Sequence, residues 1–199
     1  MNQTEQITYP IKTKRLLLTP YTMDFCEDLF QLKQLPETHR YNYTQVISRE
    51  EAVKYVEQFS AYDYHNPKAR FELAVVLKET KNYIGFIGFK GDAYKPDSTA
   101  EIYYTLHPVY FNKGLGTEAV AGMLDFGFNV LKLHRIWAGA TCENTASWKI
   151  MEKTGMRKES HWVADRPKPG KWVPGKGFEK TGLWEDGYGY AVLKNEFEK

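Results

Sequence analysis

The sequence predicts an α+β fold with a single mixed, mainly antiparallel sheet, and three observations support this class. Strand-like and helical patterns follow one another as strand, two helices, three strands, helix, strand, helix and two strands. This order lacks the regular alternation of a parallel α/β protein. The chain has 199 residues, of which 42% are hydrophobic and 26% charged, enough for one globular domain with a substantial core. We therefore expect one domain spanning residues 1–199.

The first elements are a strand and two helices. Residues 13–19 (TKRLLLT) have strand character, and residues 24–34 carry apolar side chains at helical spacing. Residues 48–51 (SREE) form a capping-box pattern, in which Ser and Glu satisfy each other's free backbone N–H groups at a helix start. A second helix is therefore expected to begin directly after Ser48.

A run of three strands is expected next. Residues 70–78 and 83–90 are rich in β-branched and aromatic residues and are separated by a short turn, which predicts a hairpin. Residues 100–106 (AEIYYTL) read as a further strand, which His107-Pro108 should end because proline cannot continue a ladder.

The second half begins with a glycine turn, NKGLG, and an amphipathic helix whose apolar face includes Val120, Leu124 and Leu131. Residues 135–141 predict a strand. A shorter helix should then start at the cap residue Asn144 and stop at Gly155.

Two more strands are expected at the end of the sequence. We place them at residues 156–163 and 187–193. Residues 165–177 (DRPKPGKWVPGKG) separate them and are rich in proline, glycine and lysine. We expect this segment to be a long basic loop with a function or high mobility, because loops of this length are uncommon in compact domains.

The glycine turn is the strongest candidate for a binding site. A loop that leads into a helix can gather several backbone N–H groups at the positive end of the helix dipole, which suits a phosphate-rich ligand. A Walker A loop is excluded because Lys113 precedes the glycines. Gly114 and Gly116 supply too few glycines for a dinucleotide-binding fingerprint. An ordinary glycine-rich turn stays open at this point.

Composition excludes several other classes. The formal net charge of +2 is too small to suggest nucleic-acid binding. Cys26 and Cys142 lie far apart without a C-x-x-C pattern, and the histidines show no ligand spacing, so we expect no metal site. No apolar run reaches the ~20 residues of a membrane span, and the N-terminus lacks an apolar signal core. We expect a cytoplasmic protein, and the sequence is compatible with a homodimer.

The regions around the turn resemble a known family. YFNKGLGTEAV, followed by LHRIWAGATCENTASWKIMEKTGM, resembles the GNAT acyltransferase superfamily, and most closely its ribosomal-protein N-acetyltransferase (RimJ/RimL-like) group. TKRLLLTPYT and GFIGFKGD with AEIYYTLHP resemble that group's first and central strands. The resemblance implies the GNAT fold, acetyl-CoA as acetyl donor and transfer to a primary amine.

The resemblance also implies which residues bind acetyl-CoA. The backbone of the turn would hold the pyrophosphate, and Thr117 would cap the helix with its hydroxyl. The pantetheine arm would lie along the strand that contains Thr105 and Leu106, and Asn144 would bond a pantetheine amide. The turn residues in this role are Asn112, Lys113, Gly114, Leu115, Gly116 and Thr117.

Two catalytic roles are predicted for the transfer, a base for the amine and a donor for the leaving sulfur. Glu101 is the first candidate base, because the family often carries an acidic residue on this strand; a structural ion pair with Lys or Arg is the alternative. Glu179 is the second candidate. Many family members protonate the leaving thiolate with a tyrosine, but Met151 stands at that position and a thioether cannot donate a proton. Ser147 is predicted to act instead, although a hydroxyl in the first helical turn can simply bond the backbone.

The acceptor amine stays open at the sequence level. A protein N-terminus and a small-molecule amine are both compatible with the sequence. A CoA-binding sensor without catalytic activity is a third possibility, because Met151 stands where many family members carry the tyrosine. The family places acceptor recognition on the first two helices and the last hairpin. The aromatic residues of those regions are Tyr41, Tyr43, Tyr62, Tyr64, Trp162, Trp172 and Trp184.

Overall fold

A computed structural model describes residues 7–42, 44–65, 70–91 and 98–197. Its strands form an eight-stranded sheet in the order β1-β2-β3-β4-β5-β6-β8-β7. All neighbouring strands are antiparallel except β5 and β6, so the predicted mixed, mainly antiparallel sheet is confirmed. The strands are β1 (Ile11–Lys12), β2 (Leu16–Thr19), β3 (Arg70–Leu77), β4 (Tyr83–Lys90), β5 (Thr99–Leu106), β6 (Arg135–Thr141), β7 (Arg157–Val173) and β8 (Gly177–Leu193).

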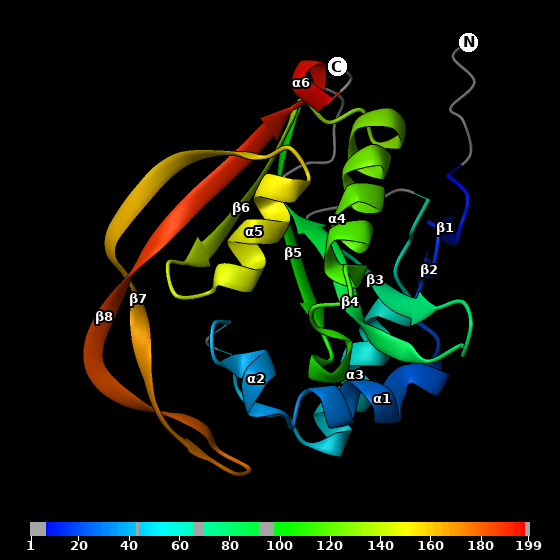
Figure 1. Ribbon diagram of the computed structural model, residues 1–199. Coiled ribbons are helices and arrows are strands. Elements are labelled where there is room, and N and C mark those ends of the chain that lie inside the picture. The colour runs from blue at the N-terminus through cyan, green and yellow to red at the C-terminus, as the bar shows by residue number, and fades with distance from the viewer. Residues whose placement is uncertain (1–6, 43, 66–69, 92–97, 198–199) are drawn as a thin grey trace.

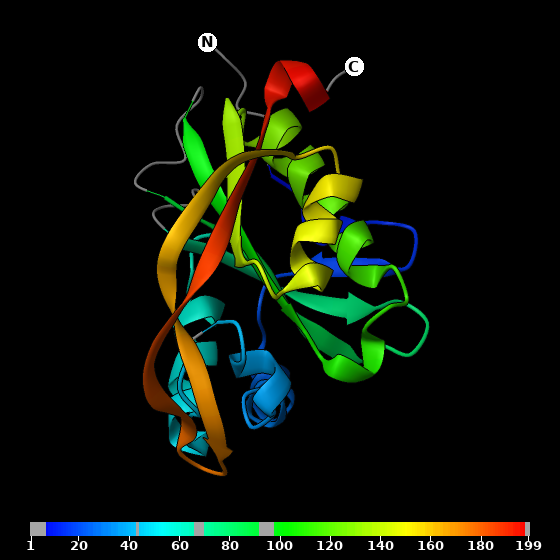
Figure 2. The ribbon, with the colours of Figure 1, turned by 60° about the vertical axis from the view of Figure 1, so that its left-hand side comes forward.

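Helices cover both faces of this sheet (Figures 1 and 2). One buried cluster joins α1 and α3 to side chains such as Ala74 and Phe86, and a larger one joins α4 and α5 to the opposite face. The helices are η1 (Met23–Phe25), α1 (Cys26–Leu32), α2 (Pro36–His39), α3 (Arg49–Ser60), η2 (Pro108–Tyr110), α4 (Leu115–Asp125), the π-helix η3 (Phe126–Val130), α5 (Thr145–Lys153) and α6 (Lys194–Phe197).

Several local predictions are confirmed. Glu51 N donates to Ser48 Oγ at 3.2 Å and Ser48 N donates to Glu51 Oε2 at 2.7 Å, which completes the capping box of α3. The hairpin β3–β4 turns at Lys81, whose φ of 62° is left-handed. Gly155 follows the end of α5 with φ of 84°, the conformation that favours glycine there.

Other local predictions need correction. The helix expected at residues 24–34 is split into η1 and α1, and α2 and α6 were not predicted. The helix α4 begins earlier than expected, with Gly114 as its N-cap and no side-chain cap. Thr117 therefore lies inside the first turn, and the cap role predicted for it is wrong.

The predicted basic loop at residues 165–177 is also wrong, because most of it is strand. The strands β7 and β8 are 17 residues each and form a curved ribbon that projects from the sheet (Figure 1). Pro167 and Pro169 are tolerated because β7 is the edge strand and its register with β8 shifts beside both residues. A Cβ at Gly170 would lie 2.8 Å from Glu179 O, so glycine allows the close approach of the two strands.

The strands β5 and β6 pair only at their beginnings. Their parallel register runs from Thr99–Arg135 to Glu101–Trp137, and β5 is paired with β4 as far as Leu106. Figure 1 shows the two strands diverging beyond this point. The divergence opens the sheet between its two helical layers and leaves the second half of β5 with one edge toward the opening.

Candidate active site

A cavity of about 640 Å³ occupies this opening. Its lining comes from both sides of the sheet. The first part, called here the α5 side, comprises residues of η2, the turn before α4, and α5. The second part, called here the α2 side, comprises residues of α2 and the segment after it, together with Lys90, Glu101 and Arg166. The cavity is therefore a passage through the sheet.

The turn before α4 forms one end of the α5 side. Asn112 has φ of 59° and Gly114 has φ of 73°, so the backbone reverses sharply before the helix. The first intrahelical bond runs from Glu118 N to Gly114 O at 3.1 Å. The N–H groups of the three preceding residues, Leu115 to Thr117, have no partner within the helix. This is the anion-binding geometry that the turn predicts.

A contact with Arg15, the residue directly before β2, holds this turn in place. Arg15 donates to the carbonyl of Lys113 at 2.9 Å and pairs with Glu118 of α4 at 2.7 Å. Of the six predicted turn residues, all but Lys113 line the cavity. The Lys113 ammonium lies 5.4 Å from the centre of the Tyr110 ring.

The helices α4 and α5 meet closely beside the turn. A Cβ added to Gly116 would lie 2.8 Å from Ile150 Cδ1, so a larger residue here would press on the end of the Ile150 side chain. Lys149 and Lys153 of α5 also line the cavity. They add positive charge that the sequence reasoning did not identify, because only the packing of α5 against α4 brings them toward the turn.

The strand β5 contributes residues to both sides of the cavity by alternation. Glu101, Tyr103 and Thr105 face the α2 side, while Tyr104 and Leu106 face α4 and α5. Glu101 is the last residue paired with β6 and forms an ion pair with Lys90 at 3.0 Å. This pair is the structural alternative that the sequence left open, and it places Glu101 beside the cavity at the same time.

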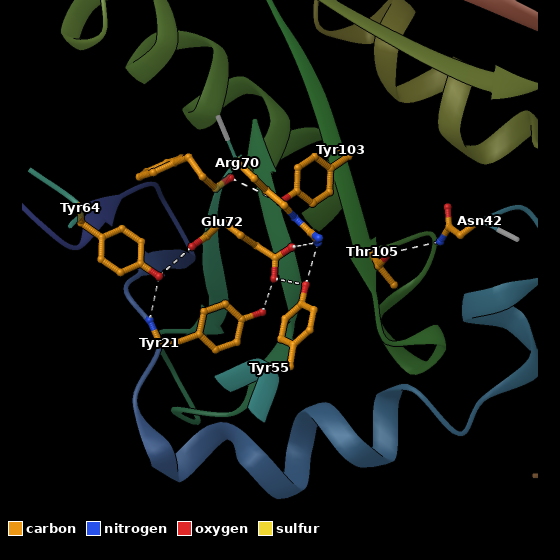
Figure 3. A network of polar contacts seen from close by, with 9 residues as sticks. Tyr21, Asn42, Tyr55, Tyr64, Arg70, Glu72, Tyr103 and Thr105 are labelled. Atoms are coloured by element: carbon orange, nitrogen blue, oxygen red, sulfur yellow. Dashed lines mark hydrogen bonds and ion pairs between the residues drawn. The ribbon is translucent and has the colours of Figure 1, made fainter. Parts of the chain in front are cut away.

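A polar network supports the α2 side (Figure 3). Asn42 Nδ2 donates to Thr105 Oγ1 at 3.2 Å and so connects the segment after α2 to β5. Arg70 donates to the Tyr103 hydroxyl at 3.0 Å and to the fully buried Glu72 at 3.1 Å. Burial of the Tyr103 hydroxyl raises its pKa well above the usual range, and the negative charge of Glu72 raises it further. Tyr103 therefore remains protonated at neutral pH.

The beginning of α5 forms the opposite wall. Asn144 caps the helix by accepting a bond from Ser147 N at 3.2 Å, and both residues line the cavity. Ser147 Oγ lies 2.9 Å from the hydroxyl of Tyr104. Met151 also lines the cavity but is otherwise packed into the core, with 1% of its surface exposed. Tyr104 was missed by the sequence reasoning, because alternation along β5 does not reveal its contact with a later helix.

The other predicted residues lie in different places. Glu179 is exposed on β8 and does not line the cavity. Tyr41 lines it, whereas Tyr62 and Tyr64 line a separate hollow of about 510 Å³ near the N-terminal strands. Trp172, near the tip of the ribbon, stacks on His39 of α2 at 5.4 Å. The predicted Tyr43 lies outside the described residues.

Two further site types were searched for in the described part of the chain. No group of three or more His, Cys, Asp or Glu side chains there is arranged to hold a metal ion. No helix among the described residues is long and apolar enough to cross a membrane.

Comparison with known proteins identifies the family of this site. Residues 15–157 match the model of the acetyltransferase (GNAT) domain. The chain belongs to the GNAT acetyltransferase family. This establishes the enzyme class as an acetyl-CoA N-acetyltransferase, and the passage between β5 and β6 is its candidate active site.

Relatives along the full chain agree with this assignment. The uncharacterized N-acetyltransferase YnaD of Bacillus subtilis is 29% identical over 94% of this chain and 98% of its own length. The crystal structure of a GNAT-family acetyltransferase from Bacillus anthracis superposes with a TM-score of 0.76 at 29% identity, covering 93% of this chain and 98% of the other.

A second solved structure shares the fold and contains CoA. Spermidine N-acetyltransferase from Vibrio cholerae, solved in complex with CoA and spermine, superposes with a TM-score of 0.73 at 19% identity. The superposition covers 93% of this chain and 99% of the other. At this identity the likeness concerns the GNAT fold alone.

Proposed function

We propose that the protein acetylates the α-amine of a protein or peptide N-terminus, as a RimJ/RimL-like member of the family. The charge of the α2 side carries this proposal. Its described lining contains three positively charged residues, Arg40, Lys90 and Arg166, and two carboxylates, Glu37 and Glu101. A polyamine brings several positive charges and needs a surplus of carboxylates, whereas an N-terminal amine brings one charge followed by neutral backbone. The balance of charges favours the second kind of acceptor.

The donor site follows from the α5 side. The free N–H groups at the start of α4 fit the pyrophosphate of acetyl-CoA, and Lys149 and Lys153 add charge near it. The open edge of β5 at Thr105 and Leu106 suits the amide groups of pantetheine, and Asn144 stands across from that edge. We assign donor binding to these residues on the strength of this geometry.

The transfer itself requires few groups. The amine nitrogen forms a bond to the acetyl carbon, the carbon–sulfur bond breaks with its electron pair on sulfur, and the proton lost by nitrogen ends on sulfur. An α-amine has a reference pKa of about 7.7–8.0, against about 10.4 for lysine, so a modest base is enough. We assign that role to Glu101, directly or through water, and the bond to the sulfur to Ser147.

The test is thiol release from acetyl-CoA with matched acceptors. We expect peptides with a free N-terminus to be acetylated, and the same peptides with a blocked N-terminus but an intact lysine to be inert. Mass spectrometry of the products locates the acetyl group. A lower KM for spermidine than for every peptide would support a small-molecule acceptor and overturn the proposal. Absence of turnover with all amines, together with thermal stabilisation by acetyl-CoA, would favour the sensor reading.

The extent and assembly of the protein are also proposals. The continuous sheet supports a single acetyltransferase domain over residues 1–199. Residence in the cytoplasm and a homodimer stay predictions, which cell fractionation and sedimentation of the purified protein would check.

A further inference from the structure

Tyr104 is placed to control the hydroxyl of Ser147. Tyr104 projects from β5 toward α5, on the opposite face of the sheet from Glu101. Its hydroxyl lies 2.9 Å from Ser147 Oγ and donates to the Ser147 carbonyl at 3.2 Å. Ser147 N is bound at the same time by the Asn144 side chain. The first turn of α5 is thus held by two polar side chains, and the Ser147 hydroxyl is in contact with one of them.

We propose that Tyr104 is a positioning residue that orients the Ser147 hydroxyl toward the departing sulfur. This inference rests on the proposed role of Ser147. It explains how the site works with Met151, whose thioether has no proton to donate. A pair of hydroxyls, one from β5 and one from α5, takes the place of a single hydroxyl from α5.

The Tyr104 and Ser147 hydroxyls can exchange hydrogen-bond partners because each carries one proton. Each hydroxyl has one proton to donate and lone pairs to accept. While Tyr104 donates to the Ser147 carbonyl, Ser147 can donate to the Tyr104 oxygen. When charge develops on the sulfur, both hydroxyls can rotate, so that Tyr104 donates to Ser147 Oγ and Ser147 donates to the sulfur. No heavy atom has to move, and a donor whose own oxygen accepts a hydrogen bond is a stronger donor.

The tyrosine remains a donor throughout this cycle. Burial raises the pKa of Tyr104 to about 12, although the bond with Ser147 opposes the shift. A thiol has a reference pKa of about 8.5, so Tyr104 does not give its proton away to the sulfur. The proton that ends on the sulfur is the one lost by the amine, and the two hydroxyls stabilise the charge until it arrives.

The experiment compares Tyr104→Phe, Ser147→Ala and the double variant. We expect Tyr104→Phe to lower kcat about three- to tenfold, the effect of one hydrogen bond, with little change in the KM for acetyl-CoA. Ser147→Ala should lower kcat further. The double variant should be no slower than Ser147→Ala, because Tyr104 acts through Ser147.

Tyr190→Phe provides the matched control. Tyr190 is also buried and also donates to α5, at 3.0 Å to Glu152, but it does not line the cavity. Its removal weakens the attachment of α5 to a similar degree without touching Ser147. We expect this variant to keep the kcat of the unmodified enzyme, which separates positioning from general stability.

A second measurement does not depend on turnover. The thiol of bound CoA can be titrated by the ultraviolet absorbance of its thiolate. Donation from Ser147 should lower the pKa of this thiol, and both Tyr104→Phe and Ser147→Ala should raise it again, while Tyr190→Phe should not.

The outcomes distinguish this inference from the proposed function. Unchanged kcat and an unchanged thiol pKa in Tyr104→Phe, with a slow Ser147→Ala, would overturn the role of Tyr104 and leave the function intact. Additive losses in the double variant would also overturn it. If the acceptor is a small amine rather than a peptide, the same comparison holds with that amine.

Discussion

At the scale of single residues, Glu72 on β3 is a buried carboxylate that joins several distant segments of the chain. Its carboxylate is fully buried and accepts from Tyr21 at 2.8 Å, Tyr55 at 2.6 Å and Arg70 at 3.1 Å (Figure 3). The sequence places Glu72 in a β-rich run without indicating these partners, which come from three other positions in the chain. A buried carboxylate is tolerated only because its partners satisfy it.

Removing this carboxylate should destabilise the protein. We expect Glu72→Ala to lower the free energy of unfolding by about 2–4 kcal/mol, because the hydroxyls of Tyr21 and Tyr55 lose their acceptor. Arg70 contributes little to this cost, because its side chain is half exposed and water can replace the carboxylate. Glu72→Gln should cost less, since an amide oxygen still accepts. Denaturant unfolding measures both.

Glu79→Ala is the control, because Glu79 is exposed in the turn of the same hairpin. It should change the free energy of unfolding by no more than about 0.5 kcal/mol. Equal stabilities for Glu72→Ala and Glu79→Ala would show that the network contributes nothing.

At the scale of elements, the sequence predicted the turn, α4 and the start of α5 well, since glycine and cap residues act locally. It failed at β7, where prolines and glycines indicated a loop. The failure has a physical reason: an edge strand needs hydrogen bonds on one side only, so proline at a bulge is acceptable there. Whether a strand lies at an edge is decided by the whole sheet.

The contact between α4 and α5 gives the first prediction at this scale. Gly116→Val should weaken acetyl-CoA binding by about tenfold, because its branched side chain must displace the side chain of Ile150, which also lines the cavity, at a cost of about 1–3 kcal/mol. Calorimetric titration measures the affinity. Ala121→Val, on the exposed side of the same helix, introduces the same side chain and should leave affinity unchanged. Full affinity in Gly116→Val would contradict the proposed donor site.

The ribbon gives the second prediction. Trp172 stacks on His39 and contacts Phe178 edge-on at 5.0 Å, so it connects the ribbon tip to α2. Trp172→Ala should raise the KM for the acceptor about two- to tenfold, as expected from losing an aromatic pair, and leave the KM for acetyl-CoA unchanged. Steady-state kinetics with each substrate varied in turn would measure both constants.

Trp184 is the matched control on the same ribbon. It is 61% exposed, and Trp184→Ala should leave both KM values unchanged. An increase in the KM for acetyl-CoA in Trp172→Ala would mean that the ribbon supports the donor site instead.

At the scale of the whole molecule, the candidate active site is formed by the divergence of β5 and β6, which are paired only at their beginnings. The parallel ladder ends at Glu101 and Trp137, and the passage beyond it is lined from segments between residues 37 and 166. A ligand that fills this passage bridges both helical layers. Binding of such a ligand should therefore raise the free energy of unfolding of the whole domain.

Acetyl-CoA should raise the melting temperature. At a concentration one hundredfold above its dissociation constant, the expected gain is about 2.7 kcal/mol, which corresponds to several degrees for a domain of this size. Differential scanning fluorimetry would measure the shift, and Gly116→Val at the same concentration should show a smaller one. A melting temperature indifferent to acetyl-CoA would contradict the assignment of the passage to the donor.

The sequence by itself determined the family, the order of most elements and the glycine turn before α4, because these depend on short-range patterns of glycine, caps and alternation. The tertiary structure alone decided that β5 and β6 part after Glu101, that Lys90 pairs with Glu101, and that Tyr104 meets Ser147. Each of these features depends on how separate elements meet, through strand register and helix packing. Local sequence patterns carry no information about such distances, so the arrangement of the groups proposed for catalysis emerged only from the fold.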